Sequence, residues 1–236
     1  MDDLNLRIAQ LTPAKRALLE QRLRQKAVNA NGFKSIQRRE KQNSTPLSFA
    51  QARMWFLHQL EPRNAAYNRP SNLELTGTLN VAALEKSLNE IVRRHEVLRT
   101  SFRPVDGQPV QNIAPTYTLT VPIVDLSHLS SEERNNEVQK LATEEAQLPF
   151  DLLHLPLVRA TLLRLGEEQH ILLLTMHHII FDGWSMGVLL RELTTLYEAF
   201  CSGKPSPLTD LPIRYTDFAH WQRERSQGDV LSSQLD

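Results

Sequence analysis

The chain has little cysteine and no excess charge of either sign. Its single cysteine, Cys201, excludes a framework of intrachain disulfides and lacks the sequence context of a nucleophile. Lysine plus arginine and aspartate plus glutamate both number 27, so overall charge gives no reason to expect nucleic acid or an anionic membrane as a partner. No apolar run is long enough for a signal peptide or a membrane span. We therefore expect a globular, cytoplasmic protein.

The distribution of polar residues along the 236-residue chain predicts one main domain behind a short helix. Residues 1–27 contain a threonine suited to capping, followed by a proline, so a short helical segment is expected there. Residues 28–45 are polar without periodicity and predict a linker. The main domain is expected over residues 46–225, and residues 226–236 should begin a following segment.

Helix-like and strand-like patterns are mixed within the main domain, which indicates an α/β (α+β) fold with a mixed β-sheet flanked by helices. Ser48, Asn80 and Ser130 stand where they can cap predicted helices. Asp106-Gly107-Gln108 between two extended stretches predicts a hairpin turn.

The most informative stretch is Met176–Ser185, with the sequence Met-His-His-Ile-Ile-Phe-Asp-Gly-Trp-Ser. It follows Ile171–Thr175, which has the length and branched composition of a buried strand, and it precedes a helical pattern that begins near Ser185. An extended stretch at 157–165 and a turn at 166–169 come before this strand. A hairpin should therefore carry two imidazoles at its end.

The two imidazoles belong to His177 and His178. A histidine beside an apolar strand is usually a packed core residue, but a pair followed three residues later by Asp-Gly is a rarer pattern. An imidazole has an ordinary pKa near neutrality, so a neutral His178 could take a proton from an amine or hydroxyl. Neighbouring residues of an extended chain point to opposite faces, so one imidazole should face the reaction space and the other should pack inside. The same geometry makes a poor chelating pair, and no metal is expected.

Asp182 and Gly183 follow the pair. The Asp182 carboxylate should orient its neighbours by pairing with an arginine or with backbone N–H groups, although a role as a second base stays open. Gly183 allows backbone or ligand to approach closely.

The pattern His-His-x-x-x-Asp-Gly at 177–183 resembles the active-site signature of the condensation domains of nonribosomal peptide synthetases, which are relatives of chloramphenicol acetyltransferase. Leu47–Leu57 resembles the first core motif of that family, and Arg94–Phe102 resembles the second. The segment Tyr215–Glu224 also matches, so the resemblance extends from about Pro46 to Arg225. Three motifs in the order of the family make this a specific resemblance.

The resemblance implies a chloramphenicol acetyltransferase-like fold in which two similar lobes enclose an active-site tunnel. Members are about twice as long as this chain, so the chain is expected to be the N-terminal lobe, with the C-terminal lobe missing and the fragment inactive alone. The implied reaction forms an amide between thioesters held on the phosphopantetheine arms of upstream and downstream peptidyl carrier proteins. No cofactor would be bound directly.

The resemblance also assigns roles. His178 would be the base or the group that positions the amine, and His177 would be a structural neighbour. Asp182 would organise the turn, and Gly183 would be the backbone against which the substrate lies.

The supporting residues expected to line the tunnel or hold the turn are Arg94, Arg99, Trp184, Ser185, Gln51 and Arg53. Either Arg94 or Arg99 would help to hold the catalytic turn, although the dipole of a helix C-terminus also explains a cation at its end. Gln51 and Arg53 would either line the tunnel or lie on an exposed helix face.

The resemblance is strongest to the class that joins two L-configured aminoacyl units, since the heterocyclising class has aspartates in place of the two histidines. Phe181 stands where smaller or polar residues are frequent, and this changes the expected pocket shape. Two other interpretations remain open. The chain could be a compact acetyltransferase-like enzyme completed at a subunit interface, or a non-catalytic lobe that binds carrier proteins.

Overall fold

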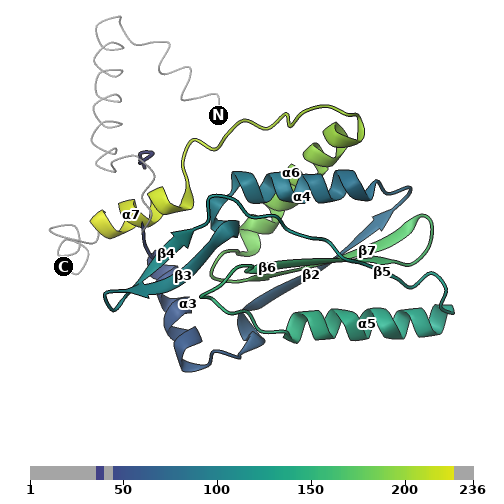
Figure 1. Cartoon of the computed structure of the whole chain (residues 1–236), viewed down its shortest axis with the longest axis horizontal. Helices are drawn as coiled ribbons and strands as arrows, with labels where there is room; N and C mark the ends of the chain where they lie inside the picture. Colours follow the sequence, from purple (N-terminus) through teal and green to yellow (C-terminus); the bar gives the residue numbers. More distant parts are fainter. Residues whose placement is uncertain (1–35, 40–44, 226–236) are drawn as a thin grey trace, which may run out of the picture. The chain divides into compact units, whose positions relative to one another are not determined.

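The computed structural model describes residues 36–39 and 45–225 (Figure 1). The chain divides into two compact units, Met1–Gln37 and Arg38–Asp236, and all described helices and strands belong to the second. The helix expected within 1–27 and the segment 226–236 lie outside the described residues. Within the described part, no helix has the length and apolar character needed to cross a membrane.

A four-stranded mixed sheet carries the two histidines. Its strands, in spatial order, are β2 (Asn68–Thr76), β7 (Gln169–His177), β6 (Val158–Arg164) and β5 (Ile123–Asp125). β7 pairs antiparallel with both β2 and β6, whereas β5 runs parallel to β6. The predicted hairpin is confirmed, because β6 and β7 pair from Val158 opposite Met176 to Arg164 opposite His170.

A second sheet has the order β1 (Thr45–Pro46), β4 (Gln108–Ile113) and β3 (Thr100–Val105). Asp106 and Gly107 join β3 to β4 with φ angles of 50° and 77°. A two-residue hairpin that matches the strand twist needs positive φ at both positions, which an Asp-Gly pair adopts readily. The predicted hairpin turn is therefore confirmed.

Five α-helices and two short 3₁₀ helices are described. They are α3 (Phe49–Leu60), η1 (Ala65–Tyr67), α4 (Val81–Arg94), η2 (Glu96–Arg99), α5 (Ser131–Gln147), α6 (Gly183–Cys201) and α7 (Tyr215–Arg225). The Ser48, Asn80 and Ser130 side chains accept from backbone N–H groups of the first turns of α3, α4 and α5, and Ser48 and Ser130 form capping boxes. All three predicted caps are confirmed.

Helices cover both faces of the four-stranded sheet, with α4 and α6 on one side and α5 on the other (Figure 1). Alternate residues of β7 point to opposite faces. Leu172 and Leu174 belong to the main core cluster, which contains the buried leucines of α4 and α6. Leu173 joins a smaller cluster with Leu163 and Val138, the latter on α5. The sheet is thus the middle layer of three.

The predicted boundary between the linker 28–45 and the main domain is wrong. Part of the expected linker belongs to the folded unit, because the Arg38 guanidinium donates to the Leu211 carbonyl at 2.9 Å and the Arg39 backbone N–H donates to Asp217 at 3.0 Å. Thr45 lies in β1. These polar residues are held by hydrogen bonds to Leu211 and Asp217. Because those partners are distant in the sequence, the local composition could not predict them.

Candidate active site at the end of the central hairpin

β7 places the two imidazoles at the end of the four-stranded sheet. His177 is the last residue of the strand, and its backbone N–H donates to the Leu157 carbonyl at 3.0 Å. The backbone N–H of His178 donates to the Tyr67 carbonyl at 2.8 Å, and that of Ile180 donates back to the His177 carbonyl at 3.0 Å. These bonds fix the backbone from which both imidazoles project.

The His177 imidazole is packed inside, with a relative exposure of 2%. Its ring lies 6.3 Å from that of His58, 6.4 Å from that of Tyr67 and 6.1 Å from that of Phe150, measured between centroids. The Ile179 backbone N–H donates to its Nδ1 at 3.1 Å, so that nitrogen carries no proton. Burial lowers the pKa of His177 to about 4, and the neighbouring His58 adds to the shift. His177 is therefore neutral at physiological pH.

The His178 imidazole is only half-buried and has the opposite hydrogen-bonding pattern. Its Nδ1 lies 2.7 Å from the Phe181 carbonyl oxygen. Because a carbonyl can only accept, Nδ1 must carry the proton. In the neutral ring, this leaves the lone pair of Nε2 free to accept a proton from another group. The two histidines differ in exposure as expected, because β7 ends at the buried His177 and the turn begins at His178. The residue with the free lone pair is the more exposed one.

The Asp182 carboxylate caps α6. Its Oδ1 accepts from the Ser185 backbone N–H at 2.9 Å and from the Ser185 hydroxyl at 2.6 Å. These bonds, the hydroxyl bond foremost, hold the pKa of Asp182 below its ordinary value against the opposing effect of burial. The expected pairing with backbone N–H groups is confirmed, whereas no arginine pairs with Asp182 in the described part of the chain. The helix begins at Gly183, two residues before the predicted start.

The side of the turn that carries Gly183 and Trp184 is open. A Cβ built on Gly183 would meet no atom within 4 Å, and the Trp184 side chain is 85% exposed. The close approach expected at Gly183 is therefore not made by any described residue of this chain. An indole exposed to this degree leaves room for a ligand or for another part of a larger protein.

Neither predicted arginine holds the catalytic turn. The Arg94 guanidinium bonds to Glu192 of α6, with two contacts of 3.2 Å, and donates to the Leu208 and Thr209 carbonyls of the connector before α7. Arg99 donates to the Ala114 carbonyl. Their sequence positions gave no information on these distant partners, so this prediction was wrong.

The tunnel-lining role of Gln51 is also wrong, as is the alternative of an exposed face. Gln51 is 1% exposed, its Oε1 accepts from the Ser48 backbone N–H at 3.1 Å, and its Nε2 donates to Gln111 at 3.2 Å. It closes the capping box of α3 and links that helix to β4. Arg53 on the same helix is exposed.

Phe181 is 7% exposed and packs in the main core cluster. Its ring therefore contributes to the core.

The residues missed by sequence reasoning are the rings around His177. His58 shares the buried face of α3 with Gln51 and Met54, a spacing of three and seven residues that marks a packed helix face. Burial lowers the pKa of His58, against the effect of the Asp151 carboxylate. The helical periodicity could have identified His58 as buried, but not its neighbour.

The family model for the condensation domain matches residues 41–236. The chain is 50% identical over 200 residues to one of the subunits of linear gramicidin synthase from Brevibacillus parabrevis, an alignment that covers 85% of this chain and 3% of that protein. It is 43% identical over 235 residues to phosphinothricin tripeptide synthetase PhsC of Streptomyces viridochromogenes, covering 98% and 22% respectively. The chain thus spans a small part of these relatives.

Among solved structures, the chain is similar to the first condensation domain of the CDA synthetase, with a TM-score of 0.71 and 26% identity over 80% of this chain and 48% of that one. It is also similar to the X-domain from teicoplanin biosynthesis, with a TM-score of 0.73 and 29% identity over 85% and 44%. Both sheets and the flanking helices agree with the expected lobe of a larger domain. The family match, the identities and the shared fold together show that this chain belongs to the condensation-domain family of nonribosomal peptide synthetases.

Proposed function

We propose that this chain is the N-terminal lobe of a condensation domain that forms an amide between two carrier-bound thioesters. The observation that carries the proposal is the Nε2 lone pair of the half-buried His178, left free because Nδ1 donates to the Phe181 carbonyl. A base held in one tautomer at the open edge of a fixed turn is suited to receive a proton from an attacking amine.

In the proposed reaction, the amine of an aminoacyl group on the downstream carrier attacks the thioester carbonyl of the upstream carrier. A C–N bond forms, the amine proton passes to Nε2 of His178, and the C–S bond breaks. The proton then goes to the departing thiolate of the phosphopantetheine arm. Acid–base help of this kind contributes about 10²–10⁴-fold, and holding both thioesters in register supplies the rest.

The other residues of the motif position this base. His177 stays neutral and packed, and its Nδ1 accepts from the Ile179 backbone N–H. Asp182 fixes the start of α6, and Gly183 offers an open backbone surface for the substrate. The proposal includes upstream and downstream peptidyl carrier proteins and a C-terminal lobe as partners, with no cofactor bound directly. The L-to-L class and a cytoplasmic location remain predictions from the sequence.

The test is His178→Ala in the complete natural protein that contains this chain, with His128→Ala as the matched control. His128 is an exposed imidazole before α5, away from the turn. We expect His178→Ala to lower the rate of amide formation by about 10²–10⁴-fold, and His128→Ala to leave it within about twofold. Full amide formation by His178→Ala would remove the base role.

The alternative interpretations predict other outcomes. An acetyltransferase-like enzyme completed between subunits would elute as an oligomer on gel filtration, whereas we expect a monomer. A non-catalytic lobe would bind carrier proteins without forming an amide, whether or not a C-terminal lobe is supplied. We expect activity only when that lobe is present.

A further inference from the structure

The C-terminal end of α5 is fixed to the sheet by two side chains. The last carbonyls of a helix have no partner inside the helix and need donors from elsewhere. Arg159 of β6 donates through Nη2 to the Glu145 carbonyl at 3.1 Å and to the Leu148 carbonyl at 2.8 Å. Asn68 of β2 donates through Nδ2 to the Ala146 carbonyl at 2.7 Å and to the same Leu148 carbonyl at 2.9 Å. These bonds determine where the chain leaves α5.

Arg159 is itself held in place. Its Nε donates to the Glu145 carboxylate at 2.6 Å, and the two side chains are 18% and 16% exposed. A charge-assisted bond between partly buried groups is stronger and less screened by salt than a surface pair. The guanidinium plane is therefore fixed by three hydrogen bonds.

That plane covers Phe150, the second residue after Leu148. The Arg159 Cζ lies 3.8 Å from the centre of the Phe150 ring, a cation–π arrangement, and Phe150 is 5% exposed. Phe150 also meets the His177 ring edge to face, at 6.1 Å and 88°. The Arg159 guanidinium therefore contacts the Phe150 ring, which in turn contacts the His177 imidazole.

The His177 imidazole helps to hold the turn that carries His178. His177 accepts from the Ile179 backbone N–H, one residue beyond His178. A displaced His177 ring would weaken that bond and release the backbone that aims the His178 imidazole at the Phe181 carbonyl. The hydrogen bonds of Arg159 go to the end of α5 and its ring contact is with Phe150, so the side-chain contacts that lead from Arg159 to the turn run through Phe150 and His177.

We propose that Arg159 is a positioning residue for the condensation reaction, and that it acts through Phe150 and His177 to fix the turn that carries His178. The inference deepens the proposed function and rests on it. The arrangement requires arginine rather than lysine, because only a guanidinium can stack on a ring while its planar edge donates to three oxygens.

The kinetic test compares Arg159→Lys with Arg164→Lys in the complete natural protein. Arg164 lies on the same strand, but it pairs at 3.4 Å with Asp125, and the two side chains are 40% and 49% exposed. We expect Arg159→Lys to lower kcat about tenfold with KM within about twofold, because a displacement of about 1 Å costs up to about 100-fold. Arg164→Lys should leave both constants unchanged. Unchanged kcat in Arg159→Lys, or equal losses in the two variants, would overturn the proposal.

A second measurement follows the tautomer directly. In the 236-residue chain, the nitrogen-15 shifts of the His178 ring should report an Nδ1–H tautomer in the wild type and in Arg164→Lys. Arg159→Lys should give a mixture of tautomers at a temperature where the chain is still folded. A single Nδ1–H tautomer in Arg159→Lys would refute the positioning role.

Two further observations keep the inference separate from other failures. Glu145→Gln removes the ion pair, but it leaves the Arg159 bonds to the Glu145 and Leu148 carbonyls and the contact with the Phe150 ring. It should therefore lower kcat less than Arg159→Lys does. An equal loss of kcat would count against an effect that passes through Phe150. Should His178→Ala retain amide formation, the proposed base role fails, and the tautomer measurement still decides whether Arg159 fixes the turn.

Discussion

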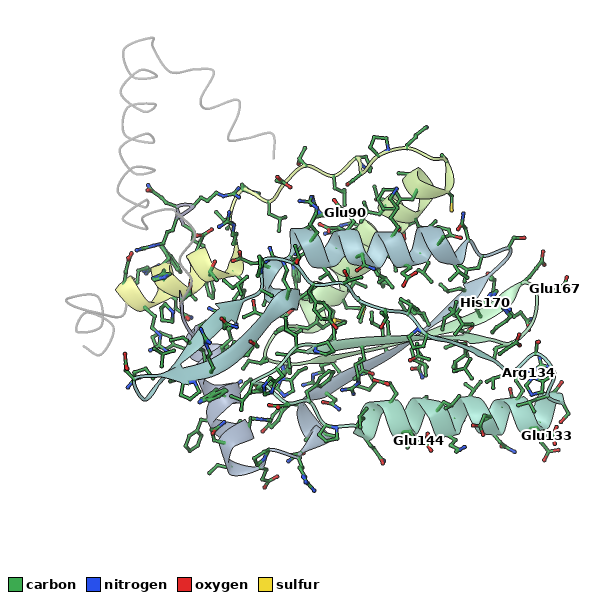
Figure 2. All side chains as sticks on the ribbon, in the orientation of Figure 1. Glu90, Glu133, Arg134, Glu144, Glu167 and His170 are labelled. Carbon is green, nitrogen blue, oxygen red and sulfur yellow. The ribbon has the colours of Figure 1, made fainter. Side chains whose placement is uncertain are left out.

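The two faces of the four-stranded sheet are covered in different ways. On one face, α4 buries Leu84, Leu88 and Ile91 against the alternate leucines of β7, and α6 adds Leu193 and Leu196. On the other, Val138 is the one buried residue of α5, a helix described over its whole length, and that helix also carries Glu133 and Glu144 (Figure 2).

The difference shows where stability and positioning reside. The face under α4 and α6 is held by apolar packing, which is strong and non-directional. The end of α5 is held by directional bonds from Arg159 and Asn68, and Arg159 covers the ring that meets His177. Substitutions on the apolar face should therefore affect folding first, and substitutions at the end of α5 should affect the reaction first.

The largest expected effect is the loss of stability when a central leucine of the apolar face is replaced. Leu172 is 0% exposed and belongs to the main cluster, so Leu172→Ala should lower the free energy of unfolding by about 3 kcal/mol. Val138→Ala on the other face should cost about half as much, because fewer methyl groups are removed from a smaller cluster. Urea denaturation of both variants measures the two values. A greater loss in Val138→Ala would contradict the division between the faces.

The next effect is acid destabilisation through His177. In the unfolded chain its imidazole is protonated near the ordinary value of 6.5, whereas in the folded chain its pKa lies at about 4. The contribution of the neutral His177 to the free energy of unfolding is therefore complete above about pH 6.5. It is lost as the pH falls towards 4, by up to about 3 kcal/mol. His177→Gln should show a flatter stability curve between these values.

Exposed His128 supplies the control for that experiment. His128→Gln should keep the pH dependence of the wild type. A wild-type curve that is flat from pH 6.5 to 4 would show that His177 is not buried in the manner described.

A smaller effect is expected at the cap of α6. Asp182→Ala removes the acceptor for the Ser185 backbone N–H and should cost about 1 kcal/mol in thermal or urea unfolding. Asp182→Asn retains an acceptor oxygen and should lose less. Equal losses in the two variants would mean that charge, rather than capping, is the role of this residue.

The smallest effect on stability is expected at Gly183. The backbone there has no positive φ and a Cβ meets nothing within 4 Å, so Gly183→Ala should leave the free energy of unfolding unchanged or raise it by less than about 1 kcal/mol. Amide formation by the complete protein should fall nonetheless, because the added methyl group occupies the proposed substrate surface. An unaffected rate would remove that role from Gly183.

The elements predicted well are those specified by local chemistry. Ser48, Asn80 and Ser130 cap helices because a side-chain oxygen three residues before a free N–H needs no distant partner. The Asp106-Gly107 turn depends on the φ angles of two residues. The predicted difference in exposure between His177 and His178 is also found, and it arises where β7 ends at His177 and the turn begins at His178.

The predictions that failed depended on partners far along the chain. Gln51 bonds to Gln111 and Arg94 to Glu192, 60 and 98 residues away. The sequence indicated polar groups at these positions without indicating which distant residue would meet them. The sequence also predicts the start of α6 near Ser185, whereas Asp182 caps the helix and Gly183 is its first residue.

The sequence alone determined the motif, the hairpin that carries it and the helices around it, since periodicity, turns and caps are properties of neighbouring residues. Only the tertiary structure decided that His178 holds its proton on Nδ1 and that His177 is enclosed by His58, Tyr67 and Phe150. It also decided that Arg159 covers Phe150. These contacts join separate elements, and their geometry exists only once the sheet and its helices have packed together.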